Sequence, residues 1–200
     1  MGGRSGQSEG GSGGGGGSSS AEISAAVANY QSTNFDQINN ELRYDKPDKY
    51  KDVISKIDKG STDKTSDNLY RGLDSDFTKT LANKHGVKDV NDINELKSKL
   101  IGKTITDKGY MSTTRDLKTA GDFARDKGTG KTTVIQISGK KKWVEVTKHV
   151  KNYRAKQEKE FIIKRGSKVK ITNVSISKSG KLILYTEIVH WFVWEGEKNN

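Results

Sequence analysis

The chain has 200 residues, no cysteine and a formal net charge of +11, from 36 Lys and Arg against 25 Asp and Glu. This length suits one domain with a small appendage, and the lack of cysteine excludes disulfides, thiolate catalysis and thiolate metal sites. No stretch approaches the roughly 18 apolar residues of a membrane-spanning helix, and no apolar segment follows Arg4 as in a signal peptide. The histidines, His85, His149 and His190, lack metal-ligand spacing, so we expect no metal and no membrane partner.

The positive charge indicates an anionic partner. Basic proteins attract acidic proteins, nucleic acids and phosphorylated cofactors, although lysines spread along the whole chain are also typical of a solvated surface. Few aromatic residues share a predicted strand with the lysines, so we expect no nucleic-acid stacking platform. The lysine-rich segment 140–156 instead favours an acidic protein partner.

The first 20 residues differ in composition from the rest. They hold ten of the 22 glycines, interleaved with serine. Such a segment buries too little apolar surface to offset its ordering entropy. We interpret residues 1–20 as a flexible tail or linker, compatible with attachment to a larger polypeptide, and residues 21–200 as one monomeric domain.

Apolar spacing predicts helices in the first part of this domain, about residues 21–60. A polar run, residues 61–67, follows Gly60 and closes the helical part. The spacings of three and four residues involve Ile23, Val27 and Tyr30, then Phe35, Ile38 and Leu42, then Tyr50, Val53, Ile54 and Ile57.

The remainder, about residues 68–195, is predicted to be rich in strands. A short strand at 68–71 is expected to stop at Gly72, and short helices are expected at 90–100 and near 120–124. Further strands are expected at 110–114, 133–137, 143–146, 161–163, 169–174 and 182–189. Helices followed by strands without regular crossovers predict an α+β fold, with N-terminal helices packed on a mixed, mostly antiparallel β-sandwich core.

Three polar motifs interrupt the predicted strands. Arg71 precedes Gly72, and a guanidinium matches phosphate or carboxylate oxygens, but a surface arginine before a turn gives the same pattern. Hydroxyl residues 112–114 form the second motif, and such residues are common on strands. Glu158 and Glu160 form the third. In a strand they would share a face, as in sites where paired carboxylates act on a sugar cation, or they would form an acidic strand edge.

Taken together and in this order, the motifs resemble the arginine–serine–glutamate class of mono-ADP-ribosyltransferases. The matching segments are Tyr-Arg-Gly at 70–72, Tyr-Met-Ser-Thr-Thr at 110–114 and Glu-Lys-Glu at 158–160. The segment 38–43 resembles the helix before the arginine strand, and the likeness covers about residues 30–190. Thr114 stands where members often have serine, which keeps the hydroxyl. The class includes bacterial toxins, so the resemblance implies a secreted or delivered effector, of bacterial or phage origin.

The resemblance implies a role for each matching residue. Arg71 would hold an NAD⁺ phosphate, Gly72 would offer backbone groups to the nicotinamide amide, and Ser112 would orient Glu160, with Thr113 and Thr114 supporting that strand. Glu160 would bind the nicotinamide ribose and stabilise the oxocarbenium-like cation. Two further residues are implied by their position: Arg125 as a second NAD⁺ contact, and Tyr153 as an aromatic contact to the substrate protein. Arg125 could equally be a solvated helix residue, and Tyr153 a half-buried loop residue.

The residue two before the catalytic glutamate indicates the acceptor in this class. Glutamate there accompanies arginine acceptors, so Glu158 would orient or deprotonate an arginine of the target protein. A carboxylate is also a fitting partner for a guanidinium. Two alternatives stay open: NAD glycohydrolase activity at the same site, and a non-catalytic basic binding module.

Overall fold

The computed structural model describes residues 18–45, 49–64, 68–128, 130–151 and 157–189. Helices come first along this part of the chain, and strands dominate its second half, as predicted. The helical segments are α1 Ser20–Asn29, a π-helical turn Tyr30–Asn34, α2 Phe35–Arg43, α3 Lys51–Gly60, α4 Ser75–His85, α5 Ile93–Leu100, α6 Leu117–Phe123 and a 3₁₀ turn Val146–Lys148. The strands are β1 Thr62–Lys64, β2 Leu69–Leu73, β3 Thr104–Thr106, β4 Met111–Thr114, β5 Thr133–Ser138, β6 Lys141–Glu145, β7 Glu160–Ile163, β8 Lys168–Ile176 and β9 Leu182–Ile188.

Hydrogen bonds join the nine strands of the described chain in the order β1-β6-β7-β4-β2-β5-β9-β8-β3. Only the β5–β9 pair is parallel, so the prediction of a mixed, mostly antiparallel arrangement is confirmed. One buried cluster contains residues of β4, β6 and β7 together with residues of β5, β8 and β9. Strands from both ends of the hydrogen-bonded order therefore pack around a common core.

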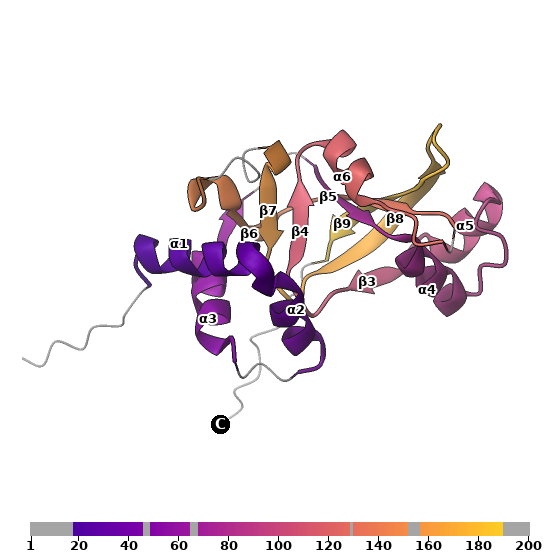
Figure 1. The fold of residues 1–200 in the computed structure, drawn as a ribbon. Coiled ribbons are helices and arrows are strands. Elements are labelled where there is room, and N and C mark those ends of the chain that lie inside the picture. Colours follow the sequence, from indigo (N-terminus) through magenta and orange to yellow (C-terminus); the bar gives the residue numbers. More distant parts are fainter. Residues whose placement is uncertain (1–17, 46–48, 65–67, 129, 152–156, 190–200) are drawn as a thin grey trace, which may run out of the picture.

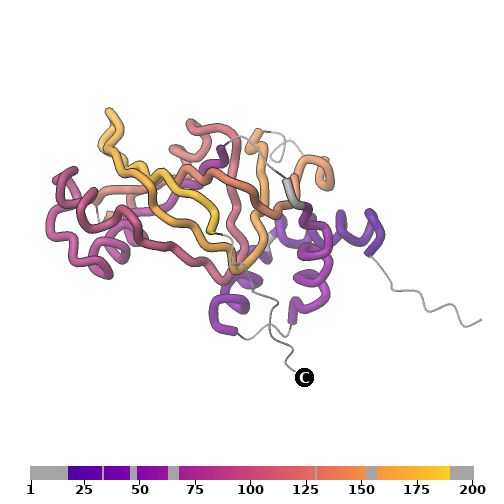
Figure 2. Tube along the Cα trace, turned by 180° about the vertical axis from the view of Figure 1, so that it is seen from behind, coloured from indigo at the N-terminus to yellow at the C-terminus, as the bar shows by residue number. Residues whose placement is uncertain are grey.

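The N-terminal helices cover the β4–β6–β7 end of the sheet (Figure 1). Their predicted apolar stripes are buried against it, with Val27, Ile38 and Ile57 fully excluded from solvent. Full burial of such a side chain contributes about 1.5–3 kcal/mol. Helices α4 and α5 lie at the other end, and Figure 2, which views the molecule from behind, shows β8 and β9 running across the near face. The sheet thus has two differently covered ends.

Several boundaries differ from the sequence-based predictions. Helix α1 begins at Ser20, inside the segment interpreted as a linker, because Ser19 and Glu22 form a capping box there. Strand β2 does not stop at Gly72; it continues through this glycine and ends at Leu73. Helix α5 begins at Ile93 rather than near residue 90, with Asp92 as its N-cap. Helix α4 and the short strands β1 and β3 were not predicted.

Strand β7 shows how the fold positions polar groups. Its Phe161 and Ile163 belong to the core between the strands, whereas Ile162 belongs to the cluster under the N-terminal helices. Side chains alternate along a strand, so Glu160 shares the helix-covered side with Ile162. The antiparallel register with β4 pairs Ile162 with Ser112 and Glu160 with Thr114. The hydroxyl strand and the glutamate therefore meet beneath α1 and α2.

Candidate active site

A cavity of about 340 Å³ lies between the N-terminal helices and the strands β2, β4 and β7. This volume is within the usual range for small-molecule sites. Seven of the residues predicted from the three motifs contribute to its wall. The predicted residues that line it are Arg71, Gly72, Ser112, Thr113, Thr114, Glu158 and Glu160. Three segments that are remote in sequence are thus brought to one cavity.

Arg71 enters this cavity from the middle of β2. Its Nη1 is buried and makes no hydrogen bond within the described chain, although Asp107 Oδ2 lies 3.5 Å away. Burial lowers the pKa of this guanidinium, and the nearby Asp107 carboxylate partly opposes the shift. A buried donor without an acceptor is costly, so this atom fits an anionic ligand such as a phosphate.

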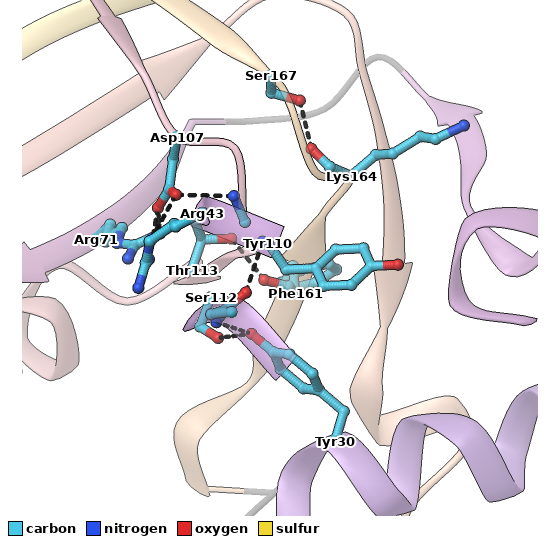
Figure 3. Close-up of polar contacts among 12 residues, drawn as sticks. Tyr30, Arg43, Arg71, Asp107, Tyr110, Ser112, Thr113, Phe161, Lys164 and Ser167 are labelled. Atoms are coloured by element: carbon cyan, nitrogen blue, oxygen red, sulfur yellow. Dashed lines mark hydrogen bonds and ion pairs between the residues drawn. The ribbon is translucent and has the colours of Figure 1, made fainter. Parts of the chain in front are cut away.

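Asp107 links Arg71 to a second arginine, Arg43 of α2. Arg43 donates to both Asp107 carboxylate oxygens, at 3.0 and 2.9 Å, and the Gly109 amide donates to Oδ1 at 2.9 Å (Figure 3). Burial by itself raises the pKa of Asp107, but the Arg43 hydrogen bonds and the Arg71 charge hold that pKa below its ordinary value. Arg43 and Arg71 both line the cavity, so two arginines of its wall, from distant segments, share the carboxylate of Asp107.

Gly72 is a glycine because α6 packs directly on β2. A Cβ atom at this position would lie 2.0 Å from the carbonyl oxygen of Ala120 and 2.6 Å from the amide nitrogen of Ala124. No side chain can be accommodated without moving the α6 backbone. The close approach leaves the Gly72 backbone at the cavity wall.

Ser112 is held by a tyrosine from the π-helical turn. The Tyr30 hydroxyl lies 3.3 Å from Ser112 Oγ and accepts a hydrogen bond of 2.9 Å from Asn39 (Figure 3). Burial raises the pKa of Tyr30, so this hydroxyl stays protonated. Thr113 donates to the carbonyl of Phe161 at 2.8 Å and ties β4 to the glutamate strand. Turns of π-helix are often found at functional sites, and this one places Tyr30 over the serine.

Glu160 is the first residue of β7 and is 8% exposed. Its Oε2 accepts a hydrogen bond from Gln31 of the π-helical turn. The neighbouring residue of this turn, Tyr30, contacts Ser112. The turn Tyr30–Asn34 therefore reaches both the serine and the glutamate motif.

Glu158 reaches the cavity by a different geometry from the one predicted. It is not on the strand: residues 157–158 form a helical turn, and Lys159 has a left-handed φ of 44°. The alternation of a strand therefore does not place Glu158 and Glu160 on one side. The turn nonetheless brings Glu158, which is half-buried, to the same wall, while Gln157 is exposed.

Comparisons with known proteins identify the family of this chain. A family model described as ADP-ribosyltransferase exoenzyme matches residues 17–190. The chain belongs to this family. Membership supports mono-ADP-ribosyltransferase activity with NAD⁺ as the co-substrate, and places the chain among toxins and effectors.

Solved structures share the fold at low sequence identity. C3stau2 from S. aureus, solved with NAD, has 18% identity and a TM-score of 0.61, covering 84% of this chain and 87% of that one. The C3 exoenzyme from Clostridium limosum has 19% identity and a TM-score of 0.61, covering 86% of each chain. The ADP-ribosyltransferase Vis, solved with agmatine, has 14% identity and a TM-score of 0.58, covering 87% and 77%. A comparison with curated proteins found no match.

One residue implied by the family resemblance, Arg125, is not brought to the cavity. Arg125 is exposed, its Nε lies 3.4 Å from the carbonyl of Asp122, and it does not line the wall. Tyr153 lies outside the described residues. The wall also contains residues that were not proposed from the sequence, namely Tyr30, Gln31, Asn39 and Arg43. The likeness of residues 38–43 to a family helix was a signal for Asn39 and Arg43 but not for Tyr30 and Gln31.

The cavity suits a dinucleotide in further respects. Phe35 and Phe123 line it and stay 45% and 44% exposed, which leaves aromatic faces open to planar rings.

No group of three metal-ligating residues occurs within the described segments. In that same part of the chain, no helix has the length and apolarity needed to cross a membrane.

Proposed function

We propose that the chain is an NAD⁺-dependent mono-ADP-ribosyltransferase that modifies arginine in a target protein and releases nicotinamide. The observation that carries this proposal is that Glu158 and Glu160 line one cavity with Arg71 and Ser112. We further propose that the part of the chain from α1 onward is a monomeric catalytic domain, that the glycine-rich segment before it is a linker, and that the protein acts as a delivered bacterial or phage effector.

The two arginines would hold the NAD⁺ diphosphate. Arg71 presents a buried donor without a hydrogen-bond acceptor, and Arg43 is fixed beside it by Asp107. Guanidiniums are suited to phosphate oxygens. The backbone of Gly72, which lies at the cavity wall, would receive the nicotinamide amide, and the exposed rings of Phe35 and Phe123 would cover the planar groups.

Glu160 would act where positive charge develops. As the bond between nicotinamide and the ribose C1′ breaks, its electron pair leaves with nicotinamide and the ribose becomes an oxocarbenium-like cation. The Glu160 carboxylate would accept a hydrogen bond from the ribose hydroxyl and stabilise this cation. Its position at the buried end of β7 supports an electrostatic role, because a preorganised charge acts more strongly away from water.

Glu158 would act on the acceptor. The guanidinium of the target arginine attacks C1′, a C–N bond forms, and one guanidinium proton passes to the Glu158 carboxylate. Vis, which shares this fold, was solved in complex with agmatine, a guanidinium compound. NAD glycohydrolase activity is the second candidate function, because water can replace the guanidinium in the same step.

The modified residue decides between these functions. Labelled NAD⁺ would be incubated with the protein and either agmatine or a cell lysate, and the products analysed by mass spectrometry. We expect ADP-ribosylated agmatine and ADP-ribose on arginine of lysate proteins. Modification at asparagine or glutamine would refute the arginine assignment. Free ADP-ribose alone would favour the hydrolase, and intact NAD⁺ would refute both.

The variant Glu158→Ala tests the division of labour between the carboxylates. Loss of a positioned base typically costs about 10²-fold or more, so transfer to agmatine should fall by about that factor. Hydrolysis of NAD⁺ should persist in part, since Glu160 remains. Glu187→Ala, which removes an exposed glutamate of β9, is the matched control. Equal residual transfer in the two variants would contradict the role of Glu158.

A further inference from the structure

A second cavity, a groove of about 360 Å³, lies beyond the active-site wall, between α2, α3 and the turn after β7. We call it the basic groove. Its floor includes Leu42 and Ile54, both buried and apolar. Lys51, Lys59 and Lys164 line it together with the ion pair of Arg165 and Asp58. The groove thus combines an apolar floor with a cationic rim.

The single carboxylate among the lining residues is already engaged. Asp58 Oδ2 accepts a hydrogen bond of 2.8 Å from Arg165 Nε, and Asp58 Oδ1 accepts one of 3.0 Å from the Tyr110 hydroxyl. Within the described chain, the ammonium groups of Lys59 and Lys164 make neither a hydrogen bond nor an ion pair. The charges of Lys59 and Lys164 are therefore not balanced by the described wall of the groove.

Lys164 shows the orientation of this rim. Figure 3 draws its side chain extended, with the ammonium directed away from the cluster of Arg71, Asp107 and Ser112. Lys164 directly follows β7, whose other end carries Glu160. One short strand therefore separates Glu160 of the cavity from Lys164 of the groove.

We propose that the basic groove binds a glutamate- or aspartate-rich segment of the protein acceptor, with an apolar side chain of that segment on Leu42 and Ile54. Charge complementarity favours this occupant, because the groove is cationic on a chain of net charge +11. None of the residues that line the groove is aromatic, so bases of a nucleic acid would find no stacking surface there. Binding of an acidic segment in the groove does not depend on the proposed function. The statement that this segment belongs to the acceptor protein rests on it.

The binding step can be tested with a defined probe. A fluorescein-labelled, glutamate-rich peptide carrying one leucine would be titrated with the protein and followed by anisotropy. We expect saturable binding that weakens as salt rises. Lys59→Glu combined with Lys164→Glu should weaken it about tenfold or more, as expected when two attractive charges become repulsive.

A charge-matched control separates the groove from general attraction. Lys97→Glu combined with Lys99→Glu changes the net charge equally on exposed positions of α5. This variant should bind the peptide almost as the parent does. Equal loss in both double variants, or binding of polyuridylate but not of the peptide, would refute the proposal. If the glutamate variant does not melt cooperatively, Lys59→Gln with Lys164→Gln replaces it, with a smaller expected loss of the same sign.

A transfer assay tests the link to the acceptor. The groove variant should modify agmatine at the parent rate but label lysate proteins less, because only a protein acceptor can reach the groove. A parallel decrease with agmatine, or unchanged lysate labelling, would refute an acceptor-binding role. If the parent protein does not modify agmatine, the proposed function fails while the peptide-binding result stands independently.

Discussion

The active-site cavity and the basic groove each contain arginine paired with aspartate, and Tyr110 lies between them. Tyr110 lines the cavity, while its hydroxyl donates a hydrogen bond to Asp58 of the groove. The two aspartates are almost equally enclosed, with Asp107 16% and Asp58 15% exposed. The cavity differs by its second arginine: Asp107 is shared by Arg43 and by Arg71, which is only 18% exposed, whereas Asp58 has one arginine partner, Arg165, which is 43% exposed. We call the cavity, with its enclosed Arg71, the enclosed end, and the groove, with Arg165 accessible to a partner, the open end.

The largest effect is expected at the enclosed end. Glu160→Gln keeps the shape of the side chain but removes its charge, so it should abolish the stabilisation of the ribose cation. Removing one preorganised electrostatic group typically costs about 10²–10³ in turnover. NAD⁺ consumption with and without agmatine, measured by nicotinamide release, is the readout.

The control for Glu160→Gln is Glu187→Gln, at an exposed glutamate of β9. It should retain parental turnover, and both variants should melt as single transitions. Near-parental NAD⁺ consumption by Glu160→Gln would show that the enclosed end is not where the reaction occurs.

Asp107→Asn should produce the next largest effect. The neutral amide can no longer hold both arginines, and a hydrogen bond to a charged group is worth about 1.5–3 kcal/mol. We therefore expect KM for NAD⁺ to rise about ten- to hundredfold, with a smaller change in kcat, since neither carboxylate of the reaction is altered. Initial-rate kinetics separate the two parameters. A fall in kcat at unchanged KM would contradict a positioning role.

The same variant has a pH signature. The folded-state pKa of Asp107 is below its ordinary value, so its contribution to stability is present above the unfolded-state pKa and is lost as pH falls through the folded-state value. The stability difference between parent and Asp107→Asn should therefore shrink in acid, below the ordinary range near about pH 4. Urea unfolding at several pH values measures this difference, and a gap that is constant with pH would refute the assignment.

Local sequence patterns predicted the elements of the site but not its long-range pairs. The strand motifs and the first three helices follow from apolar spacing, because each buries one face. Helix α4 was missed although its N-cap Asp74 and its left-handed C-terminal Gly86 are ordinary boundary signals. Its apolar stripe is short, and the strand-like segment before it dominated the pattern.

The remaining site residues depend on tertiary contacts. Arg43 and Asp107 are 64 positions apart, and nothing local indicates that they pair. The predicted alternation of Glu158 and Glu160 failed because Lys159 adopts a left-handed conformation that few residues favour. Such a turn arises from the packing around it, which the sequence of three residues does not encode.

The smallest effect is expected at the open end, from Arg165→Ala. This change removes the hydrogen bond to Asp58 Oδ2 but leaves the one from Tyr110 to Oδ1, so Asp58 keeps a partner. Because Arg165 is 43% exposed, solvent screens the pair, and we expect a loss of only about 0.2–1 kcal/mol in the free energy of unfolding, decreasing with salt. A double-mutant cycle with Asp58→Asn isolates the pair energy.

NAD⁺ turnover of Arg165→Ala should not change, because Tyr110 stays anchored between the two sites. If Arg165→Ala instead raised KM for NAD⁺ as Asp107→Asn is expected to do, the two ends would be coupled through Tyr110, and an acidic partner that draws on Arg165 would then alter NAD⁺ binding as well.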